Sequence, residues 1–121
     1  MNLLMVFIGG GAGSVLRYLL SGQIQSWWNS KFPLGTLLVN VLAGIILILV
    51  ALFLKSKNSE SLYLLLATGF CGGLSTFSTF SYENLQLIQS GNSLMALLNI
   101  VISVAAGLLS MYILYTALRT V

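Results

Sequence analysis

Charged side chains are scarce in this sequence. Only 6% of the 121 residues are charged and 58% are hydrophobic, whereas soluble globular domains carry about 25% charged and about 45–50% apolar residues. This composition excludes a soluble domain and places the chain in lipid. Nucleic-acid binding is also excluded despite the net charge of +3, because the five basic residues are scattered and form no patch for phosphates.

Metal-ligating and proton-carrying side chains are almost as rare. Histidine is absent, and cysteine occurs once, as Cys71 within an apolar segment. An internal disulfide and the usual zinc sites are therefore excluded. No Asp, Lys or His lies within a long apolar segment, which argues against a proton relay and against a cation pathway built from carboxylates.

Long apolar runs are what the sequence does contain. A hydrocarbon core of about 30 Å is crossed by roughly 20 helical residues. We therefore predict an all-α membrane protein, with one four-helix domain over residues 1–121 and transmembrane helices at about 3–20, 34–54, 62–88 and 94–118. The first run lacks a basic leader and a clear cleavage site, so we expect a mature helix rather than a signal peptide. Trp27 and Trp28 suit the headgroup level, and Pro33 lies where the second helix would begin.

Basic residues are almost evenly divided between the two sides of the membrane. Lys55, Lys57 and Arg119 fall on one side, and Lys31 and the near-terminal Arg17 fall on the other. Because Lys and Arg asymmetry normally fixes orientation, this balance is compatible with insertion in both orientations and with pairing of oppositely oriented copies. The alternative is that a single charge still decides the orientation.

Small residues recur at a spacing of four, which lets membrane helices approach closely. The pairs are Gly9 with Gly13, Gly69 with Gly73, and Ser103 with Gly107. This spacing predicts helix packing and says little about chemistry.

The third apolar segment has an unusual composition. Residues 68–81 (TGFCGGLSTFSTFS) contain three glycines followed by five hydroxyl residues. Gly72 and Gly73, followed by hydroxyl and β-branched residues, weaken a helix, and irregular backbone at membrane depth is tolerated only inside protein or beside a watery cavity. We predict a helix broken near residues 72–77, with freed carbonyls able to coordinate a cation. The alternative is a continuous helix whose Ser and Thr side chains bond to their own carbonyls.

An aromatic pair follows the expected break. Phe77 and Phe80 share a helix face at a spacing of three, and their ring edges carry partial positive charge. With the hydroxyls of Ser78, Thr79 and Ser81 nearby, this face suits a small anion that is losing its water. The alternative is a packed interface with no ligand.

Isolated polar residues occur in the other segments. Asn40 is the only amide of its apolar run and serves either as a tie between helices or as a pore-lining donor. On the fourth segment Asn99, Ser103 and Ser110 fall on one face, with Gly107 close by, and form a polar track.

Two charged residues close to the spans have open roles. Arg17 snorkels to the membrane interface, concentrates anions at a pore mouth, or does both. Glu83 is either an interfacial anchor or a vestibule residue, and the anchor is slightly favoured.

Three motifs resemble the bacterial fluoride channels known as Fluc or CrcB. They are residues 9–18 (GGGAGSVLRY), 35–40 (GTLLVN) and 72–80 (GGLSTFSTF). The resemblance covers all four expected helices. The third motif is highly specific, because a double glycine leading into Thr-Phe-Ser-Thr-Phe is hard to produce by accident in a short four-span protein.

The resemblance implies an antiparallel, dual-topology homodimer in the bacterial cytoplasmic (inner) membrane, with two fluoride pores at the subunit interface. It implies pore roles for Asn40 as the amide, for Phe77 and Phe80 as an aromatic box, for the nearby hydroxyls of Ser78, Thr79 and Ser81, and for the fourth-helix residues Ser103 and Ser110. It also implies a vestibule role for Arg17. The fourth-helix positions are the least diagnostic of these.

The resemblance further implies a structural sodium ion at the dimer interface. Its ligands would be the backbone carbonyls of Gly72 and Ser75, and the family usually has threonine where Ser75 stands. The implied activity is passive export of fluoride, which gives resistance to fluoride toxicity, by a protein that is not an enzyme.

Two other classes compete with this interpretation. A small multidrug exporter also has four short helices, but it needs a membrane-embedded carboxylate. The first two spans and the apolar part of the third, which ends at about Phe80, have none, and Glu83 follows that part closely. An assembly subunit without selective transport would use the same glycines and phenylalanines only for packing.

Overall fold

The structure of the protein, a computed structural model, describes residues 1–54 and 59–119. Its elements are the helices α1 (Asn2–Trp28), α2 (Leu34–Leu54) and α3 (Glu60–Tyr63), the wider π-helical segment η1 (Leu64–Cys71), and the helices α4 (Gly72–Leu74), α5 (Phe77–Gln89) and α6 (Ser93–Arg119). Four stretches of these elements are long and apolar enough to cross a membrane. The predicted all-α architecture with four such helices is confirmed.

Helix α1 is longer than predicted. It continues past residue 20 to Trp28 and ends at Asn29, which adopts a left-handed conformation (φ 45°) and donates its N–H to the carbonyl of Gln25. The prediction that Arg17 lies near a helix end is therefore wrong, because no proline or helix-ending residue interrupts the chain before Asn29. Arg17 lies within a helix and not in a loop. It therefore does not count toward the balance of basic residues between the two sides of the membrane. Lys55 and Lys57 lie outside the described residues.

The core forms where α1 crosses η1 and α4. Alanine side chains placed at Gly9, Gly13 or Gly73 would collide with backbone atoms of the facing helix, so glycine is needed for this approach. The packing predicted for the first two glycine pairs is confirmed. For the third pair, no atom outside the neighbouring backbone of α6 lies within 4 Å of a Cβ built at Gly107, so Gly107 makes no close contact with another described helix of the same chain.

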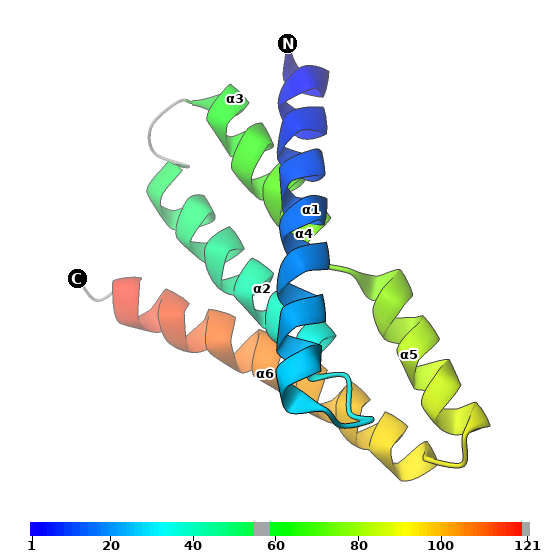
Figure 1. Cartoon of the computed structure of the whole chain (residues 1–121). Helices are drawn as coiled ribbons and strands as arrows, with labels where there is room; N and C mark the ends of the chain where they lie inside the picture. Colours follow the sequence, from blue (N-terminus) through cyan, green and yellow to red (C-terminus); the bar gives the residue numbers. More distant parts are fainter. Residues whose placement is uncertain (55–58, 120–121) are drawn as a thin grey trace.

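The third span is broken at Ser75 and Thr76. Both residues are extended, with φ/ψ of −81°/157° and −152°/123°, and α5 diverges from α4 beyond them (Figure 1). The predicted break near residues 72–77 is confirmed, and it falls at the hydroxyl residues Ser75 and Thr76 rather than at the glycines. Gly72 and Gly73 remain helical, and Gly73 lies directly against the backbone of Gly10.

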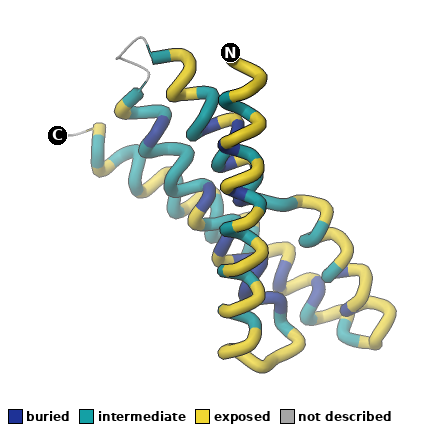
Figure 2. The backbone as a smooth tube through the Cα atoms, turned by 45° about the horizontal axis from the view of Figure 1, so that its top comes forward, coloured by how far each residue is buried: buried dark blue, intermediate teal, exposed yellow. Residues whose placement is uncertain are grey.

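Burial is concentrated at the crossing of the helices, and the outer faces are exposed (Figure 2). Helix α6 buries only Ala96 and Asn99 among its described residues, although it is 27 residues long. Large apolar side chains such as Leu108 and Ile113 remain exposed along it. Such a surface suits contact with lipid or with another apolar protein surface.

Candidate functional site

A cavity of about 310 Å³ lies at the break of the third span. We call it the break cavity. It brings together residues from α2, the break, α5 and α6, namely Asn40, Ser75, Thr76, Phe77, Phe80, Ser103 and Val104. The sequence therefore predicted most of its polar and aromatic lining, from positions that lie far apart along the chain.

Asn40 holds the broken backbone in place. Its Oδ1 accepts a hydrogen bond from the N–H of Thr76 at 2.7 Å, and its Nδ2 donates to the carbonyl of Thr76 at 3.1 Å. The amide thus replaces the partners that a continuous helix would have supplied to this residue. Asn40 is a tie between helices, and it also lines the break cavity.

Thr76 was not singled out by the sequence analysis, yet it is central to the site. Its Oγ1 accepts a hydrogen bond from the N–H of Thr79 at 3.2 Å and so caps the N-terminus of α5. The signal was available, since a Thr just before a helix is a preferred N-cap. Replacing this hydroxyl would leave the first turn of α5 without its side-chain acceptor.

The two phenylalanines form a contacting pair. Their ring centroids lie 6.1 Å apart with an interplanar angle of 39°, a tilted geometry that aromatic pairs favour. Phe80 is half-buried, whereas Phe77 is 80% exposed within the single chain. One side of the break cavity is therefore open on the surface of this chain.

The other predicted hydroxyls lie outside the lining of the break cavity. Ser78 and Ser81 are exposed on α5, and Thr79 is half-buried there. The Oγ of Ser78 lies 3.4 Å from the Oγ1 of Thr76. Ser110, further along α6, donates its hydroxyl to the carbonyl of Gly107 in its own helix. The structure thus separates these four side chains from the cavity that contains Ser103.

Arg17 reaches the break from α1. Its Nε donates to the carbonyl of Gly73 at 2.9 Å. In a continuous helix this carbonyl would accept the N–H four residues later, but the extended residues at the break separate it from that donor. The Arg17 guanidinium therefore bonds to a carbonyl freed at the break, a contact that the sequence analysis did not predict.

Most of the sequence, including every residue of the break cavity, matches a known family. Residues 4–115 match the family described as "CrcB-like protein, Camphor Resistance (CrcB)". The chain belongs to the CrcB family. Among its curated relatives are three proteins named "Fluoride-specific ion channel FluC". The one from Pyrococcus furiosus is 49% identical over 111 residues, covering 90% of this chain and 89% of the relative. Those from Serratia proteamaculans and Shewanella sp. (strain ANA-3) are 47% and 44% identical over 109 and 113 residues, covering 88% and 93% of this chain and 85% and 91% of each relative.

Two carbonyls of this CrcB-family chain fit the expected sodium ligands. The N–H of Thr76, which a continuous helix would direct to the carbonyl of Gly72, bonds to Asn40 instead. The N–H of Thr79 likewise bonds to the Thr76 side chain rather than closing a helical turn on Ser75. Gly72 and Ser75, whose carbonyls are freed in this way, both line a second cavity of about 160 Å³ between α2, η1 and α4. Carbonyl oxygens freed from a helix are suitable ligands for a hard cation.

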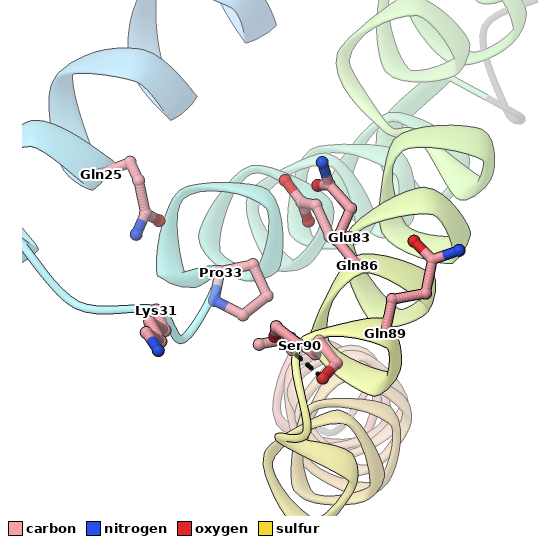
Figure 3. A pocket seen from close by; sticks show the side chains of 8 residues that line it. Gln25, Lys31, Pro33, Glu83, Gln86, Gln89 and Ser90 are labelled. Carbon is pink, nitrogen blue, oxygen red and sulfur yellow. Dashed lines mark hydrogen bonds between the residues drawn. The ribbon is translucent and has the colours of Figure 1, made fainter.

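Glu83 lines a polar pocket of about 620 Å³ between α1, the connection from α1 to α2, and α5 (Figure 3). Its Oε1 accepts a hydrogen bond from the buried hydroxyl of Thr36 at 2.7 Å. Its Oε2 is buried and has no hydrogen-bond partner within the described part of the chain. Glu83 therefore turns inward toward α2, unlike a carboxylate that anchors a helix at the lipid surface.

Replacing Arg17 with Leu is expected to lower the free energy of unfolding by about 1–3 kcal/mol, because the Gly73 carbonyl loses its donor. Thermal denaturation of purified protein in detergent measures this change. Arg119→Leu is the matched control, since Arg119 is exposed near the end of α6 and contacts only Tyr115 of its own helix in the described residues. Equal melting temperatures for the two variants would contradict the assigned role of Arg17.

Proposed function

We propose that this protein is a fluoride-specific ion channel that lets fluoride leave the cytoplasm passively and so protects the cell from fluoride. The observation that supports this most is a cavity lined by an amide, hydroxyls and aromatic rings at a break within a membrane span. The named relatives, which match this chain over most of their length, carry the same activity in their names. We place the channel in the bacterial cytoplasmic (inner) membrane.

The break cavity supplies groups that can replace water around a small anion. Fluoride is strongly hydrated, so its path must offer donors continuously. The Nδ2 of Asn40 has two hydrogens, and one of them is bonded to Thr76; we assign the other to fluoride. The ring edges of Phe77 and Phe80 carry partial positive charge and continue the path. The hydroxyls of Ser78, Thr79 and Ser81, and that of Ser110, extend it on either side of the cavity, and Arg17 attracts anions at its mouth.

We further propose that two chains assemble as an antiparallel, dual-topology homodimer that completes the pore. The high exposure of Phe77 supports this, because an open cavity wall facing lipid would not hold a hydrated ion. The Gly72 position is also open, with no atom within 4 Å of a Cβ built there. A sodium ion held by the carbonyls of Gly72 and Ser75 at this interface would add fixed positive charge near the path of the anion.

The direction of transport follows from simple acid chemistry. Fluoride enters as the neutral acid from acidic surroundings and ionises inside the cell. The membrane potential then drives the anion outward, with a free energy of about 2.3 kcal/mol per charge for each 100 mV. No chemical energy source is required for this export.

Purified protein in liposomes loaded with fluoride tests the proposal. Fluoride efflux that needs no proton gradient, measured with a fluoride electrode, is the expected result. Efflux that requires a proton gradient would favour an exporter. Efflux no faster than from protein-free liposomes loaded with fluoride would leave only a packing role for the glycines and phenylalanines.

Phe80→Ile is expected to reduce fluoride efflux at least about tenfold, since an aliphatic side chain of similar bulk lacks the electropositive ring edge. The same liposome assay measures the change, and size-exclusion chromatography checks that the assembly is intact. Efflux equal to that of the unaltered protein, with the assembly preserved, would remove the aromatic pair from the mechanism.

A further inference from the structure

Two buried amides and the half-buried Ser103 connect the break cavity to the backbone of α5. The hydroxyl of Ser103 lies 3.1 Å from Oδ1 of Asn99, the Nδ2 of Asn99 lies 2.9 Å from Oδ1 of Asn84, and the Nδ2 of Asn84 lies 3.0 Å from the carbonyl of Phe80. Asn84 and Asn99 are only 5% and 1% exposed. We call this chain of hydrogen bonds the amide relay.

The direction of the amide relay is fixed at one end. A backbone carbonyl can only accept, so the group of Asn84 that faces Phe80 is its NH₂. The oxygen of Asn84 must then face Asn99, which therefore presents its own NH₂ there and turns its oxygen toward Ser103. Two oxygens 3.1 Å apart need a hydrogen between them, so Ser103 is the donor.

This direction determines what Ser103 offers to the break cavity. A serine hydroxyl has one hydrogen and two lone pairs, and its hydrogen is bonded to Asn99. Ser103 lines the cavity, so it presents lone pairs there. Lone pairs repel an anion and accept hydrogen bonds from a donor.

We propose that Ser103 does not bind fluoride directly but accepts a hydrogen bond from a water molecule, whose second hydrogen points to the ion. Asn84 and Asn99 are then positioning residues that act through Ser103. The proposal rests on the proposed channel function and adds to it a water site and two residues that do not line the cavity.

Reversal of the Ser103 hydroxyl is disfavoured by burial. If Ser103 turned its hydrogen toward fluoride, Oδ1 of Asn99 would lose this donor in a place that water does not reach. The neighbouring amides cannot compensate by flipping, because Asn84 would then direct an oxygen at the Phe80 carbonyl. The arrangement therefore holds Ser103 as an acceptor.

The first test is the fluoride concentration that gives half-maximal current in liposomes, for the unaltered protein and for Ser103→Ala. We expect a change of less than about threefold, because no direct bond to the ion is lost. An increase above about threefold would overturn the proposal, since a hydrogen bond to a charged group is worth more than a tenfold change in affinity. If the unaltered protein carries no current, the channel function itself fails.

The second test releases Ser103 from the amide relay. In the double variant Asn84→Leu/Asn99→Leu, apolar side chains replace both amides at once, so neither amide is left buried without a partner. The freed hydroxyl can then donate to fluoride, and we expect the half-maximal concentration to fall at least about threefold. Adding Ser103→Ala should reverse this fall.

A purely structural role for the amides gives a different result. It would lower the maximal current and leave the half-maximal concentration unchanged, with or without Ser103→Ala, and this outcome would overturn the proposal. If the double variant does not assemble, the Ser103→Ala measurement decides alone, because that substitution removes only one oxygen atom.

Discussion

Asn40→Asp is expected to lower fluoride efflux by about 100-fold. The aspartate keeps an oxygen for the N–H of Thr76 but directs a second oxygen at the Thr76 carbonyl, where the amide now donates. If ionised, it also puts a negative charge beside the path of an anion. Two like charges about 4 Å apart repel by about 4 kcal/mol at an effective dielectric constant of about 20, which is enough to account for a loss of roughly 100-fold in rate. The liposome efflux assay measures the loss.

Asn40→Leu separates the two causes of that loss. Leucine removes both hydrogen bonds to Thr76 without adding charge. It therefore reports how much stability and flux are lost when Asn40 no longer holds the backbone at the break. We expect a lower melting temperature for Asn40→Leu and a larger loss of flux for Asn40→Asp. If Asn40→Asp conducts as well as the unaltered protein, Asn40 does not lie on the route of the ion.

Gly13→Ala is expected to destabilise the fold by about 1–3 kcal/mol or to prevent assembly. A methyl group at this position would collide with the carbonyl of Phe70 and the N–H of Leu74 on the facing segment. These are backbone atoms, so the helices must move apart to admit it. Thermal denaturation in detergent measures the change in stability.

Gly22→Ala and Gly11→Ala are the matched controls on the same helix. No atom outside the neighbouring backbone of α1 lies within 4 Å of a Cβ built at either position. These variants should melt at or slightly above the temperature of the unaltered protein, because alanine favours a helix over glycine by about 1 kcal/mol. A Gly13→Ala protein as stable as these controls would show that the helix crossing can admit a methyl group at this position.

The break survives at membrane depth because other elements bond to its freed backbone groups. Arg17 of α1 donates to Gly73, Asn40 of α2 bonds to both backbone groups of Thr76, and Thr76 itself caps α5. Unpaired backbone groups are costly where no water is available. Each tie therefore stabilises the irregular backbone and positions the lining of the break cavity.

The helices and the existence of a break were accessible to sequence reasoning because they are local properties. Apolar length predicted the spans, and the Gly and hydroxyl residues of segment 68–81 predicted the interruption. The predicted region of the break contains Ser75 and Thr76, but the end of the first helix at Trp28 and the helical state of Gly72 and Gly73 were not predicted. Gly73 illustrates the reason, since its lack of a side chain serves the contact with Gly10 rather than the break.

The sequence by itself determined that this protein lies in a membrane, that it has four spans, and which family it resembles, because composition and motifs can be read without knowing contacts. Only the tertiary structure decided that Asn40 clamps Thr76, that Arg17 turns to Gly73, and that Asn84 and Asn99 orient Ser103. The physical reason is that a polar side chain in a span must find a partner, and the crossing of the helices decides which partner lies within reach.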